Sequence, residues 1–330
     1  MLADWLEQSL NETASTPRGG EIPGGRFRVP GPGLLELTPV SAAPEAPAVV
    51  LSVGIHGNET APIELLGASL ARLEAGLMTL GSPVLVILGN LEAIRAGTRF
   101  VATNLNRLFH RDLADTGMEA DRARALMHAV DAFFERHATR RRLHYDLHTA
   151  IRGSQYPRFA VEPYADATTT PEQWQWLAGA AIQAVLHQHT HSWTFSHYSK
   201  HYHAAQAFTL ELGRALPFGD NGLAPLAPMG RMLDALLAGR SPATAEASRI
   251  AFFRVEHELM RHAEDFRLCF DDDTPNFTEF APGTCLAEDA QAGSFTVGET
   301  ALRVVFPNAN VELGARAALL VSATQAPPTS

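Results

Sequence analysis

The run AVVLSV at residues 48–53 is followed at once by GIHGNET at residues 54–60. A short continuous apolar run predicts a buried strand, and the two glycines of the second run allow a tight turn after it. This turn places His56 and Glu59 three residues apart, and imidazole and carboxylate are two common types of zinc ligand. Two such groups after a rigid strand suit a metal site. A polar loop fits the same short run, so groups elsewhere in the chain must decide.

The composition is that of a soluble globular protein, with 330 residues, 46% hydrophobic and 19% charged. This length allows one large domain and a smaller one. No apolar run approaches the roughly 20 residues that a membrane-spanning helix needs, and the first residues lack the pattern of a signal peptide. We therefore expect a cytoplasmic protein with no membrane partner. Cys269 and Cys285 could pair, but free buried thiols fit this location better.

The charge pattern limits the kinds of partner. A net charge of −10 argues against a nucleic-acid partner. Lys200 is the only lysine, so the other permanently charged basic side chains are arginines. A GC-rich coding bias explains this preference without any function. An anion pocket in this chain would still be built from guanidinium groups, whose paired donors suit carboxylates.

Residues 46–240 alternate apolar strand patterns with helical patterns, which predicts an α/β sheet covered by helices on both faces. Residues 1–45 are rich in glycine and proline, hold one amphipathic helix near Asp4–Leu10, and are expected to pack on this domain. The predicted strands are 48–53, 84–88, 143–147, 159–161 and 207–212, and the predicted helices are 61–75, 120–138, 171–187 and 230–238.

A domain boundary is expected near residues 238–242, where the helical periodicity stops. Short strand patterns follow at 250–255, 300–306 and 317–321, and turn signals with glycine, proline and asparagine separate them. Residues 241–330 are therefore predicted to form a small β-rich domain. Its tail, residues 324–330, is predicted to be disordered.

His148 is the best candidate for a third metal ligand. It lies in HYDLHTA, residues 144–150, at the carboxyl end of a predicted strand, where open α/β sheets place their sites. Two histidines and one glutamate would leave one coordination position open, as in catalytic zinc sites. Asp146 points to the same face of the strand and could orient an imidazole. Exposed polar residues at a strand end are the alternative interpretation.

A hydrolytic zinc site also needs a proton acceptor, and Glu211 is the candidate. It stands in the apolar segment FTLELG, residues 208–213. Burial there would raise the pKa of its carboxyl group, which helps it to take and return a proton. A salt-bridged glutamate on a strand edge is the alternative.

Arginines supply the candidate anchors for a substrate. Arg107, in NLNRLF at residues 104–109, suits bidentate binding of a carboxylate. Arg99, eight residues upstream, could stabilise a carboxylate or a developing oxyanion, although most arginines are solvated surface charges. The segment 198–203 is expected to be a polar loop near the site. Weaker candidates for further contacts are Arg152, Arg158, Lys200, His201 and His203.

With these segments the chain resembles the succinylglutamate desuccinylase and aspartoacylase group of the zinc carboxypeptidase superfamily. The matching motifs are GIHGNE at 54–59, NLNR at 104–107, DLHT at 146–149 and ELG at 211–213. Their order and spacing match, and the resemblance covers roughly residues 45–330. Aspartoacylases typically have aspartate where this chain has Asn104, so the desuccinylase branch is the closer match.

The resemblance implies a zinc-carboxypeptidase-like mixed sheet flanked by helices. It also implies a C-terminal β domain that narrows the mouth of the active site. One zinc ion per subunit would be the cofactor. The implied ligands are His56, Glu59 and His148.

The same resemblance implies that Glu211 is the general base. Asn106 and Arg107 would hold a substrate carboxylate, with help from Arg99. The implied reaction is hydrolysis of N-succinyl-L-glutamate to succinate and L-glutamate, the last step of the succinyl route of arginine catabolism.

Other functions stay open at this point. An aspartoacylase-like deacylase would act on another N-acyl amino acid. A carboxypeptidase is disfavoured by the implied C-terminal cover, and a metabolite sensor would not need Glu211. A structural zinc site would normally use four protein ligands. The exact acyl group, the residues that hold the distal succinyl carboxylate, the metal loaded in the cell and the oligomeric state, including a homo-oligomer, are not decided by the sequence.

Overall fold

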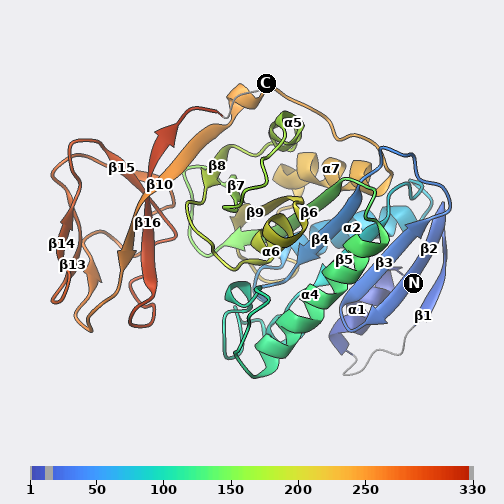
Figure 1. Cartoon of the computed structure of the whole chain (residues 1–330), viewed down its shortest axis with the longest axis horizontal. Helices are drawn as coiled ribbons and strands as arrows, with labels where there is room; N and C mark the ends of the chain where they lie inside the picture. The colour runs from blue at the N-terminus through green and yellow to red at the C-terminus, as the bar shows by residue number, and fades with distance from the viewer. Residues whose placement is uncertain (1, 12–17, 327–330) are drawn as a thin grey trace.

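The computed structural model describes residues 2–11 and 18–326. In this part of the chain a 13-stranded mixed sheet runs through the molecule in the order β1-β2-β3-β5-β4-β6-β9-β7-β8-β10-β16-β15-β12, and a second sheet has the order β11-β13-β14 (Figure 1). The strands are β1 (Arg18–Ile22), β2 (Gly25–Gly31), β3 (Leu34–Pro39), β4 (Ala48–Val53), β5 (Val84–Leu88), β6 (Arg142–Ala150), β7 (Arg158–Glu162), β8 (Ala184–His187), β9 (Gln206–Arg214), β10 (Ala251–Met260), β11 (Arg267–Leu268), β12 (Thr278–Phe280), β13 (Cys285–Asp289), β14 (Gly293–Thr296), β15 (Leu302–Val305) and β16 (Arg316–Thr324).

Helices cover both faces of the main sheet, as the sequence predicts. One face packs against α1, α2, α3, α5 and α7, and the other against α4 and α6. Alternate residues of β4 divide between the two cores, with Val49 and Leu51 on the first face and Val50 on the second. The helices are α1 (Leu2–Asn11), α2 (Ala61–Glu74), α3 (Leu91–Ala96), α4 (Met118–Arg136), α5 (Pro171–Gly179), α6 (Phe195–His203) and α7 (Ala227–Leu237), with short 3-10 turns η1 (Leu105–Arg107), η2 (Ala224–Leu226) and η3 (Ala247–Arg249).

The central strands β5, β4, β6 and β9 are parallel, so their carboxyl ends lie at one edge of the sheet. Val53 at the end of β4 pairs with Leu147 of β6, and His148 pairs with Glu211 of β9. Side chains from three separate segments therefore lie close together at this edge, where open α/β sheets place their sites.

The turn after β4 is held close to α3, and only glycine fits there. Gly54 has a φ of 67°, in the left-handed region that favours glycine. A Cβ atom on Gly57 would lie 2.0 Å from the carbonyl carbon of Ala93 in α3. The first of these glycines turns the chain and the second permits the close approach, which together fix the position of His56 and Glu59.

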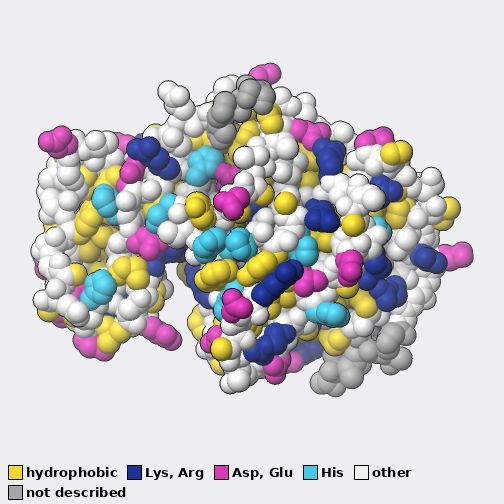
Figure 2. Space-filling model, viewed as in Figure 1, with side chains coloured by type: hydrophobic (Ala, Val, Ile, Leu, Met, Phe, Trp, Pro, Cys, Tyr) yellow, Lys and Arg dark blue, Asp and Glu magenta, His cyan; other side chains and the backbone are white. Residues whose placement is uncertain are grey.

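The C-terminal strands continue the main sheet. The strand β10 pairs in parallel with β8 and antiparallel with β16, and β16 and β15 lead to the edge strand β12. The three-stranded sheet packs on these strands around a separate apolar core. In Figure 1 these strands project to the left of the helix-covered body, and Figure 2 shows the same lobe with a notch beside it.

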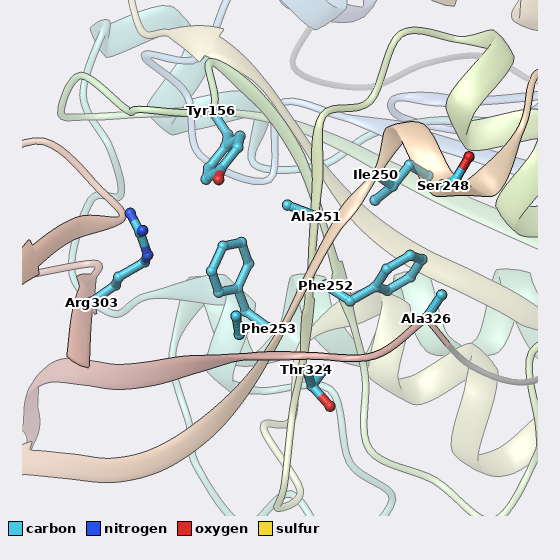
Figure 3. A pocket seen from close by; sticks show the side chains of 10 residues that line it. Tyr156, Ser248, Ile250, Ala251, Phe252, Phe253, Arg303, Thr324 and Ala326 are labelled. Atoms are coloured by element: carbon cyan, nitrogen blue, oxygen red, sulfur yellow. The ribbon is translucent and has the colours of Figure 1, made fainter. Parts of the chain in front are cut away.

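A pocket lies at the junction of this lobe with the body. Figure 3 shows Tyr156, Phe253 and Arg303 on one side of β10 and Ile250 and Phe252 on the other. Its lining contains none of the residues that the sequence singled out as metal ligands or catalytic groups.

Most predicted elements are confirmed. The strands at 48–53 and 84–88 have the predicted bounds, and α1 covers the predicted N-terminal helix. The α/β class with a mixed sheet and a small C-terminal β region is confirmed as well. Of the predicted disordered tail, Thr324 ends β16, and residues 327–330 lie outside the described residues.

Three predictions are wrong. The predicted helix 171–187 ends at Gly179, because Ala181 adopts a φ of 62° and residues 184–187 form β8 between β7 and β10. The segment 198–203 is not a loop but lies within α6, which Thr194 caps by accepting a hydrogen bond from the His197 N–H. The two cysteines are free but half-exposed rather than buried, with their Sγ atoms 3.5 Å apart.

The helices show no membrane-spanning character. Across residues 2–11 and 18–326, none combines the length and hydrophobicity that a span requires.

Candidate active site

The structure brings His56, Glu59 and His148 together, although His148 lies 92 positions after His56 in the sequence.

 The first two residues lie in the turn after β4, and His148 lies near the end of β6, 89 positions after Glu59. All three side chains are almost fully buried, with exposed fractions of 3%, 2% and 2%. Their ligand atoms lie within 4.8 Å of one another. This arrangement offers two imidazoles and one carboxylate to a metal ion.

The Glu59 carboxylate lies at the centre of the group. Its Oε1 lies 2.8 Å from His56 Nδ1, and its Oε2 lies 2.8 Å from His148 Nδ1. Arg99 donates to Oε1 over 2.8 Å, and the Thr149 N–H donates to Oε2 over 3.0 Å. Burial alone would raise the pKa of Glu59, but the two imidazoles hold it well below its usual range. Glu59 is therefore ionised at neutral pH.

Oxygen acceptors hold the outer nitrogens of both imidazoles. His56 Nε2 lies 3.0 Å from Asn104 Oδ1, and His148 Nε2 lies 2.9 Å from Asp146 Oδ2. The Asn106 N–H also donates to Asn104 Oδ1, which fixes the orientation of that amide. Such partners would place the hydrogen on Nε2 and leave the lone pair of Nδ1 available to a metal ion.

A second layer of hydrogen bonds fixes Asp146 in turn. The hydroxyl of Ser52 donates to Asp146 Oδ1 over 2.6 Å. The same hydroxyl lies 2.8 Å from His144 Nε2, and the other nitrogen of His144 lies 2.7 Å from Ser199 Oγ. All four side chains are buried, so this network connects β4, β6 and α6 beneath the site.

The donor set fits a cation. Burial lowers the pKa of His56 to about 4, despite the nearby Glu59 charge, so His56 is neutral at neutral pH. A neutral imidazole has only one N–H, yet both nitrogens of His56 face acceptor oxygens. A cation beside Nδ1 would satisfy the lone pair of that nitrogen and the Glu59 carboxylate together.

Glu211 lies beside this group, on β9 directly across from His148. It is 7% exposed, and within the described residues its Oε2 has no hydrogen-bond partner. Burial raises the pKa of Glu211 to about 7, and the negative charge of Glu59 acts in the same direction. A carboxyl group with this pKa can accept and return a proton near neutral pH.

The predicted anchors lie on η1 and the segment before it. Arg107 is exposed to solvent and donates to the backbone oxygen of Asn106 over 2.7 Å. Desolvation by surrounding protein atoms, with the positive charges of Arg316 and Arg99, lowers the pKa of Arg107 to about 10, so it stays charged at neutral pH. Asn106 is buried, and its Oδ1 accepts from the Phe195 N–H.

The weaker candidates have structural partners. Lys200 is buried and donates to Glu162 over 2.6 Å and to Thr169 over 2.7 Å. The Nε of Arg158 donates to the oxygen of Ala181, and His203 Nε2 lies 2.7 Å from an oxygen of Asp131. His201 belongs to a histidine cluster, and Arg152 has a buried Nη1 that makes no hydrogen bond within the described residues.

Sequence reasoning missed Asn104, Ser52 and His144. A signal for Asn104 exists, because it opens the motif that contains Arg107. Ser52 is the single polar residue of β4. The sequence does not reveal which residue either side chain contacts, because the hydrogen bonds of Asn104 and Ser52 join segments that lie 48 and 94 positions apart.

Comparison with known proteins agrees with this geometry. The family described as the succinylglutamate desuccinylase/aspartoacylase catalytic domain matches residues 45–237, which is more than half of the chain. The chain belongs to the succinylglutamate desuccinylase/aspartoacylase family. The AstE/AspA barrel-sandwich hybrid domain of the same group matches residues 248–324.

Individual members of the family align over most of the chain. A succinylglutamate desuccinylase of Pseudomonas paraeruginosa is 45% identical, with 88% of each chain covered. One from Yersinia pseudotuberculosis is 37% identical, with 97% of each chain covered. The crystal structure of a succinylglutamate desuccinylase from Chromobacterium violaceum superimposes with a TM-score of 0.86, at 36% identity and with 98% of each chain covered.

The contact between Asp146 and His148 gives a test of the metal site. Replacing Asp146→Asn removes the charge that orients the imidazole, and should lower the affinity for zinc by about 10- to 100-fold. Competition with a chromogenic chelator measures this affinity. The exposed Asp220, replaced in the same way, is the control. Equal affinities in the two variants would show that Asp146 does not orient a zinc ligand.

Proposed function

We propose that the protein is a zinc-dependent amidohydrolase that cleaves N-succinyl-L-glutamate into succinate and L-glutamate. The observation that carries the proposal is the position of Glu211. This buried carboxyl group, with a pKa of about 7 and an Oε2 that has no hydrogen-bond partner among the described residues, lies beside the buried His56, Glu59 and His148. A site that only binds metal does not need such a proton acceptor.

The choice of substrate is supported by the relatives and by the arginines. Relatives that cover 88% to 97% of this chain carry the name succinylglutamate desuccinylase. A substrate with three carboxylates needs local positive charge in a protein of net charge −10. Arg99 and Arg316 lie close enough to Arg107 for their positive charges to contribute to the lowered pKa of its guanidinium group, and Arg316 belongs to β16.

Each side chain has a role in the proposed reaction. Glu211 takes a proton from the attacking water while the water oxygen bonds to the amide carbon. Arg99 stabilises the charge that develops on the carbonyl oxygen. Glu211 then gives its proton to the nitrogen of the leaving glutamate as the C–N bond breaks. Zinc, when bound by His56, Glu59 and His148, supplies a Lewis acid that polarises the carbonyl and acidifies the water.

Substrate positioning falls to Asn106 and Arg107. The guanidinium of Arg107 suits a bidentate contact with a carboxylate. The Nδ2 group of Asn106 makes no hydrogen bond within residues 2–11 and 18–326, while Oδ1 anchors α6. This division leaves the amide nitrogen free to donate to the same carboxylate.

The proposal also covers the domain organisation of the protein, its metabolic pathway and its location in the cell. Residues 46–240 would form the catalytic domain, and residues 241–330 would narrow its mouth so that small acylated amino acids enter in preference to peptides. The enzyme would carry out the last step of the succinyl route of arginine catabolism in the cytoplasm. Partners other than the substrate and further copies of the chain are not required.

Removing the proposed base tests the assignment directly. Replacing Glu211→Gln should lower kcat for N-succinyl-L-glutamate by about 10²- to 10⁴-fold, with zinc retained. Because the base must be ionised, kcat/KM of the unchanged enzyme should fall as the pH drops through the pKa of Glu211, which is about 7 without a cation. A bound cation moves this fall to lower pH, since positive charge favours the carboxylate. Near-normal turnover in the variant would exclude Glu211 as the base.

Removing the proposed anchor should act on substrate binding. Replacing Arg107→Ala deletes a charge-assisted contact worth about 1.5–3 kcal/mol, so KM for N-succinyl-L-glutamate should rise by about 10- to 150-fold. Steady-state kinetics measure the effect. Replacing the exposed Arg240 by alanine is the control. An unchanged KM in the Arg107 variant would remove this residue from the substrate site.

A further inference from the structure

A second group of histidines lies outside the site described above. His197 and His201 are one turn apart on α6, and side chains four positions apart lie on the same face of a helix. His191 comes from the segment before the helix. One ligand nitrogen from each of the three lies within 4.8 Å of the others. Figure 2 shows histidine side chains gathered near the middle of this face, in the region where Figure 1 places α6.

The three rings are closely packed but share few hydrogen bonds. His191 Nδ1 lies 2.9 Å from His197 Nε2, and the rings of His197 and His201 stack 5.3 Å apart at 12°. His197 is fully buried, and its Nδ1 makes no hydrogen bond within the described residues. A buried polar atom without a hydrogen-bond partner destabilises the folded state by about 1–3 kcal/mol. Such an atom in a folded protein therefore needs an explanation, and a bound ion is one.

The protonation state of the rings suits a metal. Burial lowers the pKa of His197 to about 4, with a further contribution from the neighbouring histidines. Desolvation and the proximity of His191 also lower the pKa of His201. Both rings are therefore neutral at neutral pH, which is the form that binds a metal.

Trp193 holds His191 in the group. Its ring stacks on His191 at 5.3 Å and 17°, and meets the ring of His197 edge-on at 5.2 Å. Its backbone has a φ of 51°, in the left-handed region that bulky residues rarely adopt. Such a conformation costs of order 1–3 kcal/mol and is retained where the surroundings require it. Here the Trp193 oxygen accepts a hydrogen bond from the Phe109 N–H.

We propose that His191, His197 and His201 form a second metal site, which takes a divalent transition metal such as Zn²⁺, Ni²⁺ or Cu²⁺. Three imidazoles without a carboxylate favour these metals over Mg²⁺ or Ca²⁺. Bonds of about 2.0–2.1 Å in tetrahedral geometry place ligand nitrogens about 3.3 Å apart. His191 and His201 are exposed and can reach this spacing by small rotations, while His197 stays fixed in the core.

The position of this cluster connects it to the substrate anchors. The Phe195 N–H, in the first turn of α6, donates to Asn106 Oδ1 over 2.9 Å. The Phe109 N–H, two residues after Arg107, donates to Trp193. A metal bound by the three histidines would fasten the segment before α6 to the helix beside these contacts. The proposal does not depend on the reaction assigned to the first site.

Counting bound metal tests the proposal. The full-length, tag-free protein is stripped of metal and titrated with Ni²⁺ by calorimetry, beside a His191→Ala/His201→Ala variant. The parent should bind one more equivalent than this variant, whatever the first site holds. His189→Ala is the matched control, because His189 is exposed in the same segment but outside the cluster, and it should bind as the parent does. Equal stoichiometry in the parent and the double variant would overturn the proposal.

The fluorescence of Trp193 gives a second, local measurement of metal binding, which is compared only among variants that are shown to fold. Cu²⁺ bound at the cluster should quench the fluorescence of Trp193, and the quenching should be lost in Trp193→Phe and in the double variant. The single variant His201→Ala, which removes one exposed ring, should weaken Cu²⁺ binding by more than about 10-fold. Unfolding temperatures measured in EDTA establish that each variant is folded. Quenching that persists in a folded double variant would contradict the site.

Discussion

The buried charge of Glu59 is the constraint on which the rest of the site depends. Taking a carboxylate out of water costs several kcal/mol unless partners compensate. Two imidazoles, the Arg99 guanidinium and the Thr149 N–H surround this carboxylate. These partners come from the turn after β4, the segment after α3 and the end of β6. The three segments must therefore assemble together, and they close the edge of the sheet around one negative charge.

The environments at the ends of the parallel strands shift the pKa values of two carboxyl groups in opposite directions. Glu59 lies among imidazole, guanidinium and N–H groups that keep it ionised, while Glu211, on the neighbouring strand β9, is buried and its Oε2 has no hydrogen-bond partner in the part of the chain that the structure describes. Their pKa values are moved in opposite directions by environment alone, a pattern that assigns different chemical roles to similar groups. In the proposed reaction the first binds the metal and the second moves the proton.

The sequence predicts the elements that depend on local pattern and misses those that depend on distant contacts. β5 is a continuous apolar run and β4 is apolar except for Ser52, so the sequence predicts both strands with their observed bounds. The sequence predicts a helix at residues 184–187, because nothing in the local sequence reveals their pairing with β7 and β10. It does not predict the helix α6, because histidine, tyrosine and serine are only moderate helix formers. Asn104 and Ser52 act through contacts that only the fold creates.

The dependence of this chemistry on zinc can be measured as the rate of amine release from N-acyl amino acids, on metal-stripped protein before and after one equivalent of zinc. We expect that kcat/KM is highest for N-succinyl-L-glutamate, that a chelator abolishes turnover, and that zinc restores it. A preference for N-acetyl-L-aspartate would point to an aspartoacylase-like enzyme. Turnover that continues in the presence of a chelator would contradict the metal-dependent mechanism altogether.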